Sequence, residues 1–262
     1  MPLPNFFIIG ANKAGTTSLY RYLGQHPQIF FGEIKEPSYY TFEKGLIAPR
    51  PTKASAAIYP RLVKTLSAYK HLFDDVTTET AIGDASTTYL TFPRSAETIK
   101  RHRPQSRIVA VLRNNADRAY SQYSMYAEMG WEDRTFEDVI EDEVRFGGRG
   151  ELFVDIGFYN DRLKAFYDAF GSDAVRVYLY EDLERRPRWL VRDIFAFLGV
   201  DPHFSPDMSA RFNASTPRAP MKEATKRLLT DLYREDNAKL QSLIQRDLHH
   251  WMGPPADSSG SR

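Results

Sequence analysis

The chain has 262 residues, of which 35 are Lys or Arg and 34 are Asp or Glu, so its formal net charge at pH 7 is +1. A general polyanion binder would carry a marked basic excess, and this balance argues against nucleic acid as a partner. The sequence contains no cysteine. Disulfides, thiolate nucleophiles, iron–sulfur clusters and cysteine zinc sites are therefore excluded.

The length and the 42% hydrophobic content predict one domain with a real core over residues 1–252, followed by a disordered tail over 253–262. The longest apolar stretches, such as residues 108–112, are far shorter than the roughly 20 residues that span a bilayer. The first residues, MPLPN, lack the zones of a signal peptide. We therefore expect a cytosolic protein with no membrane contact. The oligomeric state is not encoded in any visible pattern.

Short β-type runs alternate with longer helical patterns, which predicts an α/β fold with a central, mainly parallel sheet flanked by helices. A strand is expected at residues 6–9, a helix at about 16–25 and a second strand at 28–31. Residues 43–57 contain Pro49 and Pro51 and are expected to be irregular. The remaining predicted elements are strands at 81–84, 107–112 and 175–180 and helices at 58–73, 93–102, 116–128, 135–144, 158–170, 187–198 and 222–248.

Two apolar patterns on these helices are assigned to the core. Tyr120, Tyr123 and Tyr126 recur every three residues along one helix, where core packing is favoured over a role in walling a cleft. The second pattern lies on the last predicted helix and comprises Leu228, Leu229, Leu232, Leu240, Leu243 and Ile244.

The segment GANKAGTT, residues 10–17, lies between the first strand and the first helix. Backbone N–H groups at a helix N-terminus form a nest for anions there, so the segment is expected to bind phosphate. In a nucleotide-hydrolysing loop, a lysine directly follows the second glycine and the next hydroxyl holds Mg²⁺. Here Thr16 follows Gly15, and the lysine stands earlier, at Lys13.

The predicted buried strand 107–112 ends at Arg113, where a nucleotide-hydrolysing enzyme could present an aspartate to Mg²⁺. A cation at this point suits an anion that is bound without metal. Asp84 is the alternative magnesium ligand, and it keeps open a phosphate-loop kinase that uses ATP and Mg²⁺. A nucleotide-binding module without catalytic activity is a further alternative.

Three segments together resemble the sulfotransferases that use 3'-phosphoadenosine 5'-phosphosulfate, especially their bacterial and glycosaminoglycan-type branch. They are KAGTTS at 13–18, KEPSYY at 35–40 and VLRNNADRAYS at 111–121. The resemblance extends from residue 5 to about 220. It implies a three-layer phosphate-loop fold, an enzyme that needs no metal, and a small-molecule or saccharide acceptor.

The resemblance also implies roles for individual residues. The glutamate after the second strand acts as the catalytic base in that family, which gives this role to Glu36. Arg113 and Ser121 match the pair that holds the 3'-phosphate. The looser segment FNASTPR, residues 212–218, resembles the loop that closes over the cofactor and adds Arg218. The family's first motif holds the 5'-phosphosulfate, which assigns to the cofactor site Lys13, Ala14, Gly15, Thr16, Thr17 and Ser18.

The chemistry of sulfuryl transfer fits these residue types. The protein must neutralise the departing phosphate oxygen and deprotonate the acceptor, so Lys13 is expected to donate to the bridging oxygen and Glu36 to accept the proton. Simpler interpretations stay open at this stage: a strand-end salt bridge for Arg113, a helix-surface position for Ser121 and a surface pair of Lys35 with Glu36. His26 is the rival base. The acceptor stays open too, because the last loop departs from the family pattern. Many glycosaminoglycan enzymes carry Lys-Gly-Arg in that loop, whereas this chain has FNASTPR.

Overall fold

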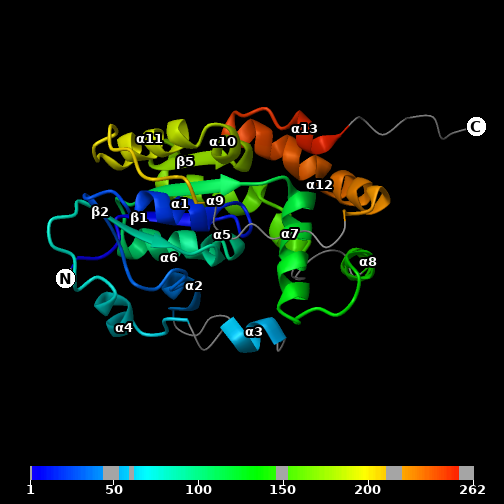
Figure 1. The fold of residues 1–262 in the computed structure, drawn as a ribbon, viewed down its shortest axis with the longest axis horizontal. Helices are drawn as coiled ribbons and strands as arrows, with labels where there is room; N and C mark the ends of the chain where they lie inside the picture. Colours follow the sequence, from blue (N-terminus) through cyan, green and yellow to red (C-terminus); the bar gives the residue numbers. More distant parts are fainter. Residues whose placement is uncertain (1, 44–52, 59–61, 146–152, 211–219, 254–262) are drawn as a thin grey trace, which may run out of the picture.

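The computed structural model of the protein describes residues 2–43, 53–58, 62–145, 153–210 and 220–253 (Figure 1). Its centre is a five-stranded sheet with the strand order β2-β3-β1-β4-β5. All four pairs of neighbouring strands are parallel. The strands are β1 (Phe6–Gly10), β2 (Ile29–Phe31), β3 (Ala81–Ala85), β4 (Arg107–Leu112) and β5 (Val175–Leu179).

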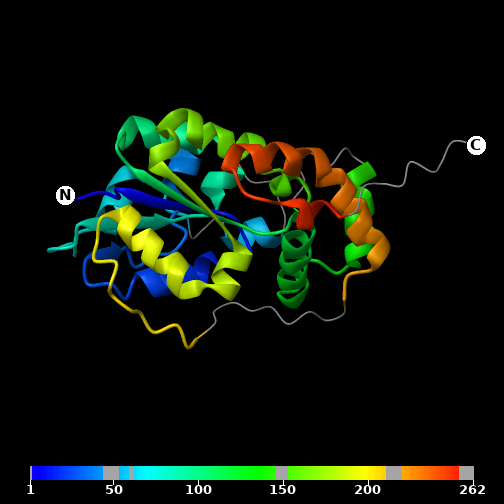
Figure 2. The same cartoon turned by 90° about the horizontal axis from the view of Figure 1, so that it is seen from above.

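The sheet is parallel because its central strands are apolar on both faces. All five residues of β1 are buried, and so is every residue of β4 except Arg107. Strands of this kind need cover on both sides, which helical crossovers supply. Figure 2 shows the sheet between two helical layers, with α1 and α11 on one side and α6 and α9 on the other. The predicted α/β fold with a parallel sheet is confirmed.

The helices follow the strands in the alternation that the sequence predicts, with several short ones between them. Two single-turn 3₁₀ helices, η3 (Asp155–Gly157) and η4 (Ser172–Ala174), flank one of the long helices. The α-helices are α1 (Thr16–Leu23), α2 (Tyr39–Phe42), α3 (Lys53–Ile58), α4 (Leu66–His71), α5 (Thr88–Thr91), α6 (Arg94–His102), α7 (Asn115–Glu128), α8 (Phe136–Arg145), α9 (Asn160–Phe170), α10 (Tyr180–Arg185), α11 (Pro187–Leu198), α12 (Glu223–Ile244) and α13 (His249–Met252).

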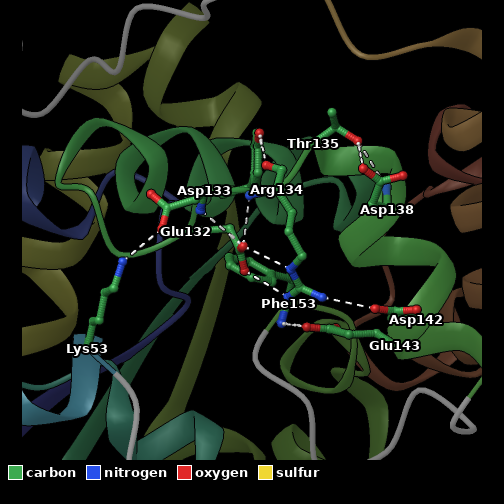
Figure 3. Close-up of polar contacts among 10 residues, drawn as sticks. Lys53, Glu132, Asp133, Arg134, Thr135, Asp138, Asp142, Glu143 and Phe153 are labelled. Atoms are coloured by element: carbon green, nitrogen blue, oxygen red, sulfur yellow. Dashed lines mark hydrogen bonds and ion pairs between the residues drawn. The ribbon is translucent and has the colours of Figure 1, made fainter.

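A second apolar cluster lies beside the sheet, where α7, α8 and α12 pack together. A polar network fixes α8 at its edge (Figure 3). Arg134 donates from Nε and Nη2 to the Glu132 carboxylate, at 3.0 and 2.9 Å, and from Nη1 to Asp142 Oδ2 at 2.9 Å. The three tyrosines of α7 also contribute here: Tyr126 is buried in the cluster, and Tyr120 and Tyr123 pack against it. Their assignment to core packing is confirmed.

Two predicted helices are wrong in extent. Of residues 58–73, only Ile58, which ends α3, and Leu66–His71 are helical within the described ranges. The later helix begins where the Thr65 hydroxyl caps it by accepting from Ala68 N at 3.1 Å. The last long helix ends at Ile244 and not at 248, because Gln245 takes a left-handed conformation with φ 53°.

Three further comparisons correct or limit the sequence predictions. Residues 53–57 belong to α3, although the sequence indicated irregular structure over 43–57, and residues 44–52 lie outside the described residues. Leu228 is 42% exposed, so its assignment to the core is wrong, whereas Leu229 and Leu240 are fully buried. The single domain and its tail stay predictions, since the tail beyond Gly253 is not described. None of the described helices is long and apolar enough to cross a membrane.

Candidate active site

The candidate site lies at the carboxyl ends of the central strands. The chain crosses from β1 to β2 and β3 on one side and then to β4 on the other, so the strand order reverses at β1. In open parallel sheets, ligands bind outside the carboxyl ends of the strands at this point. The predicted phosphate loop follows β1 directly and therefore occupies it.

The phosphate loop leaves the N-terminus of α1 open for an anion. Gly15 is the N-cap residue, its φ is 84°, and no side chain caps the helix. The first turn contains no acidic residue. A Cβ atom on Gly15 would lie 2.4 Å from Leu183 Cδ2 and 3.3 Å from the Tyr180 ring, so only glycine fits between this loop and α10. Uncapped N–H groups at a helix N-terminus attract negative charge.

Two cationic side chains meet at this loop. The Arg113 guanidinium donates from Nη1 to the Lys13 carbonyl at 3.0 Å and lies 4.6 Å from the centre of the Tyr180 ring. Lys13 itself has φ 64°, and its ammonium donates to Met125 Sδ at 3.6 Å. Burial lowers the pKa of Lys13, and the nearby charge of Arg113 lowers it further. Such crowding of like charges is relieved when an anion binds between them.

The strand-end salt bridge that was the simpler alternative for Arg113 is not observed: no carboxylate among the described residues pairs with it. Its carbonyl accepts from the Tyr159 hydroxyl at 3.1 Å, which holds the end of β4 in place. Arg113 is half-buried, so its guanidinium is only partly exposed to solvent and partly faces the loop.

Helix α7 carries Ser121 toward the same loop. The Asn114 side chain caps this helix by accepting from Ala116 N and Asp117 N, which starts it directly after Arg113. Ser121 is buried, so the interpretation as a helix-surface residue is wrong. Residues four apart on a helix share a face. Ser121 therefore lies on the same face as Met125, which contacts Lys13.

Glu36 lies at the carboxyl end of β2, beside the residues that follow β3. Its Oε1 accepts from Lys35 Nζ at 2.6 Å, so the ion pair of the simpler alternative exists, although both side chains are about two-thirds to four-fifths buried. Its Oε2 accepts from the backbone N and the hydroxyl of Thr87, at 2.6 and 3.1 Å. The backbone N of Glu36 donates to Ala85 O at 3.0 Å. These contacts hold the carboxylate in one orientation at the half-buried edge of the sheet.

The other predicted residues of the cofactor site divide into two groups. Ala14, Thr16 and Ser18 are buried, and Thr17 is half-buried, all at the start of α1. Arg218 lies outside the described residues, so its role stays a prediction.

His26 is not available as a base. Its Nδ1 accepts from Gln28 N and its Nε2 contacts Asp201 O, both at 3.0 Å. It lies between the end of α1 and the start of β2, at the amino edge of the sheet. Thr87, Met125 and Tyr180 are neighbours of the site that were not predicted from the sequence. Tyr180 follows β5 directly, so its position at the carboxyl edge was a usable signal.

Asp84 does not fit the role of a magnesium ligand. Its side chain is 2% exposed, and its two oxygens accept from the hydroxyls of Tyr69, Tyr89 and Ser86 at 2.6 to 2.7 Å. Across the ranges that the structure describes, no group of three or more His, Asp or Glu side chains is arranged to hold a metal ion.

Residues 4–206 match a model described as the sulfotransferase family. The chain belongs to this family. The sequence of the sulfotransferase is 35% identical to a solved sulfotransferase from Alicyclobacillus acidocaldarius, with 96% of this chain and 99% of the other covered and a TM-score of 0.83.

Two curated relatives are more distant. The sulfotransferase is 23% identical to human carbohydrate sulfotransferase 15 over 95% of its length and 54% of the relative. It is 26% identical to the bovine bifunctional heparan sulfate N-deacetylase/N-sulfotransferase 2 over 98% of its length and 30% of the relative. The chain thus spans about half or less of the curated relatives it matches. The family match and the similarity to the Alicyclobacillus acidocaldarius sulfotransferase confirm the resemblance, the phosphate-loop fold and the assignment as an enzyme.

Proposed function

We propose that this sulfotransferase moves a sulfuryl group from 3'-phosphoadenosine 5'-phosphosulfate to a hydroxyl or amine of a saccharide acceptor. The observation that carries the proposal is the crowding of Lys13 and Arg113 at an uncapped helix N-terminus. This arrangement suits an anion with two phosphate groups. The kinase alternative is not favoured, because Asp84 was its candidate magnesium ligand. Both oxygens of this carboxylate already accept hydrogen bonds from the hydroxyls of three neighbouring side chains.

The donor would be held by both ends. The N–H groups and hydroxyls of residues 15–18 would bind the 5'-phosphate, and Arg113 with Ser121 would bind the 3'-phosphate. The Lys13 ammonium would donate to the oxygen that bridges phosphorus and sulfur. When the sulfur–oxygen bond breaks, negative charge develops on that oxygen, and a preorganised cation stabilises it most in a partly desolvated site.

Glu36 would act as the base. A carboxylate oxygen has two lone-pair sites, and within the described residues Oε1 accepts only from Lys35, which leaves one site for an acceptor hydroxyl. The proton moves to Glu36 while the acceptor oxygen forms its bond to sulfur, in line with the departing phosphate. Lys35 and Thr87 keep the carboxylate in place during this step.

The acceptor class follows from the relatives alone. One is named a carbohydrate sulfotransferase and another a heparan sulfate N-sulfotransferase, so a sugar hydroxyl or amine is the first acceptor to test. The bacterial branch and the cytosolic location stay predictions, and no feature of the described residues bears on the oligomeric state.

The test combines binding with turnover. Calorimetry with adenosine 3',5'-bisphosphate, AMP and ATP is expected to give the tightest binding for the bisphosphate. Labelled donor is then supplied with a panel of saccharides and small alcohols, with and without EDTA. Transfer that depends on ATP and Mg²⁺, together with equal affinities for the three nucleotides, would refute the proposal.

A further inference from the structure

Asp84 is a buried carboxylate that has no cationic partner among the residues that the structure describes. It lies near the end of β3, and its Oδ2 accepts from the hydroxyls of Tyr69 and Tyr89 at 2.7 and 2.6 Å. Its Oδ1 accepts from Ser86 Oγ at 2.6 Å. No Lys, Arg or His among the described residues forms an ion pair with it. A buried carboxylate without a counter-charge is costly, so its presence calls for a role.

The Ser86 hydroxyl links Asp84 to the segment that carries Glu36. While it donates to Asp84, Ser86 Oγ accepts from the backbone N of Ser38 at 3.0 Å. The residues on either side of Ser86 are also hydrogen-bonded to Glu36. The backbone N of Glu36 donates to Ala85 O, and Thr87 donates two hydrogen bonds to the Glu36 carboxylate. The four residues from Asp84 to Thr87 therefore form a cradle for residues 36–38.

The cradle holds a backbone that would not keep its shape alone. Glu36 and Ser38 both have positive φ values, 66° and 56°, although neither is glycine. Non-glycine residues persist in this region only where surrounding contacts determine their conformation. The hydrogen bond from the Ser38 amide to Ser86 Oγ is one such contact, and Ser86 keeps its orientation because its hydroxyl donates to Asp84.

We propose that Asp84 is a positioning residue for Glu36: it orients Ser86, and Ser86 holds the left-handed segment that presents the Glu36 carboxylate. The inference rests on the proposed function for its catalytic consequence. Asp84 does not touch substrate, since it is sealed beneath α4 and α5 by the rings of Tyr69 and Tyr89.

The electrostatics agree with this geometry. Burial raises the pKa of Asp84 to about 6, and the charge of Glu36 raises it as well, whereas the three hydroxyl donors lower it. The groups that face Asp84 are Glu36 and the phenols of Tyr40, Tyr69 and Tyr89, whose pKa values are raised mainly by burial. The phenols therefore stay neutral near pH 7, where Asp84 is mostly ionised and accepts from the hydroxyls of Tyr69, Tyr89 and Ser86.

The experiment uses Ser86→Ala, Asp84→Asn and Ser86→Thr, with Ser106→Ala as the matched control. Ser106 is also a buried serine, but its hydroxyl has no hydrogen-bond partner among the described residues. Each variant is measured for kcat at saturating donor, for KM of the acceptor, for affinity toward adenosine 3',5'-bisphosphate, and for amide hydrogen exchange of the peptide over residues 35–40.

For Ser86→Ala and Asp84→Asn, we expect kcat to fall at least tenfold, with KM and bisphosphate affinity within threefold of the wild type. Exchange over residues 35–40 is expected to accelerate at least tenfold. Ser86→Thr should restore most of kcat, because it restores the hydroxyl, and Ser106→Ala should match the wild type. Should Asp84→Asn fail to fold, Ser86→Ala alone decides the proposal.

Unchanged exchange and a kcat within twofold of the wild type in Ser86→Ala would overturn the inference. So would a loss of activity that only follows the folded fraction of the variant. If the wild type binds no bisphosphate and transfers no sulfuryl group, the proposed function fails, but the exchange measurement still tests whether Asp84 and Ser86 hold the Glu36 segment.

Discussion

The contact between the phosphate loop and α10 can be tested by adding one methyl group at Gly15. In Gly15→Ala, a left-handed φ of 84° costs roughly 1–2 kcal/mol for a residue with a Cβ atom. The new Cβ would also lie 2.4 Å from Leu183 Cδ2, and forcing an extra methyl into a packed site costs roughly 1–3 kcal/mol. The two effects together predict a loss of about 2–5 kcal/mol in the free energy of unfolding.

Gly130 provides the matched control. Its φ is 67°, and a Cβ there would meet nothing within 4 Å, so Gly130→Ala should lose only the conformational part, roughly 1–2 kcal/mol. The change in entropy of the unfolded chain is the same for both substitutions and cancels in the comparison. Urea denaturation of both variants gives the difference. Adding Leu183→Ala to Gly15→Ala should remove the steric part of the loss, measured against Leu183→Ala alone.

Equal destabilisation of Gly15→Ala and Gly130→Ala would refute the reasoning, because α10 would then not press on the loop. The same pair of variants tests the anion site. The N–H groups at the start of α1 depend on the loop conformation, so Gly15→Ala should weaken bisphosphate binding whereas Gly130→Ala should not.

Four further predictions concern the site. Arg113→Ala should weaken binding of adenosine 3',5'-bisphosphate at least tenfold, about 1.4 kcal/mol, but leave AMP binding unchanged in calorimetry; an equal loss for both nucleotides would contradict the 3'-phosphate role. Lys13→Ala should abolish sulfuryl transfer with the unfolding midpoint preserved, while EDTA leaves wild-type turnover intact. Glu36→Gln should lower kcat about 10²–10⁴-fold with little change in bisphosphate affinity, and Lys35→Ala should do less; a kcat above a tenth of the wild type, with chemistry rate-limiting, would exclude Glu36 as the base. The pKa of Asp84 is raised on folding from 3.8 to about 6, so the native form binds this proton more tightly than the unfolded chain. Relative to Asp84→Asn, the wild type should therefore gain up to about 3 kcal/mol as the pH falls from about 6 to about 4, and urea denaturation across this window checks it.

Short-range sequence patterns were sufficient to predict most of the fold. The apolar runs at residues 6–10 and 108–112 are buried on both faces of the sheet, so their strand character is visible without the rest of the chain. The short helices α2 and α5, with four residues each, were not predicted. Helices this short are set by tertiary packing and have no periodicity of their own.

The sequence pattern also gave a wrong prediction where the burial of a residue depends on its tertiary neighbours. Leu228 continues the apolar pattern of α12 yet is 42% exposed, because none of the elements that the structure describes covers that part of the helix surface. The pattern predicted which residues can pack, but burial depends on whether another segment lies opposite.

The sequence by itself determined the family, the parallel sheet and the phosphate loop. These follow from contiguous residues: a buried strand, the order of lysine, glycine and threonine, and a helix start. Only the tertiary structure decided that Arg113 contacts the Lys13 carbonyl 100 positions earlier, and that Asp84, through Ser86, holds the segment of Glu36. The carboxyl ends of parallel strands meet at one edge of the sheet, so side chains far apart in the chain become neighbours there. The hydrogen-bond partners and the burial of these side chains set their charge and orientation. Both depend on how the strands are arranged in the sheet, and no local sequence pattern encodes them.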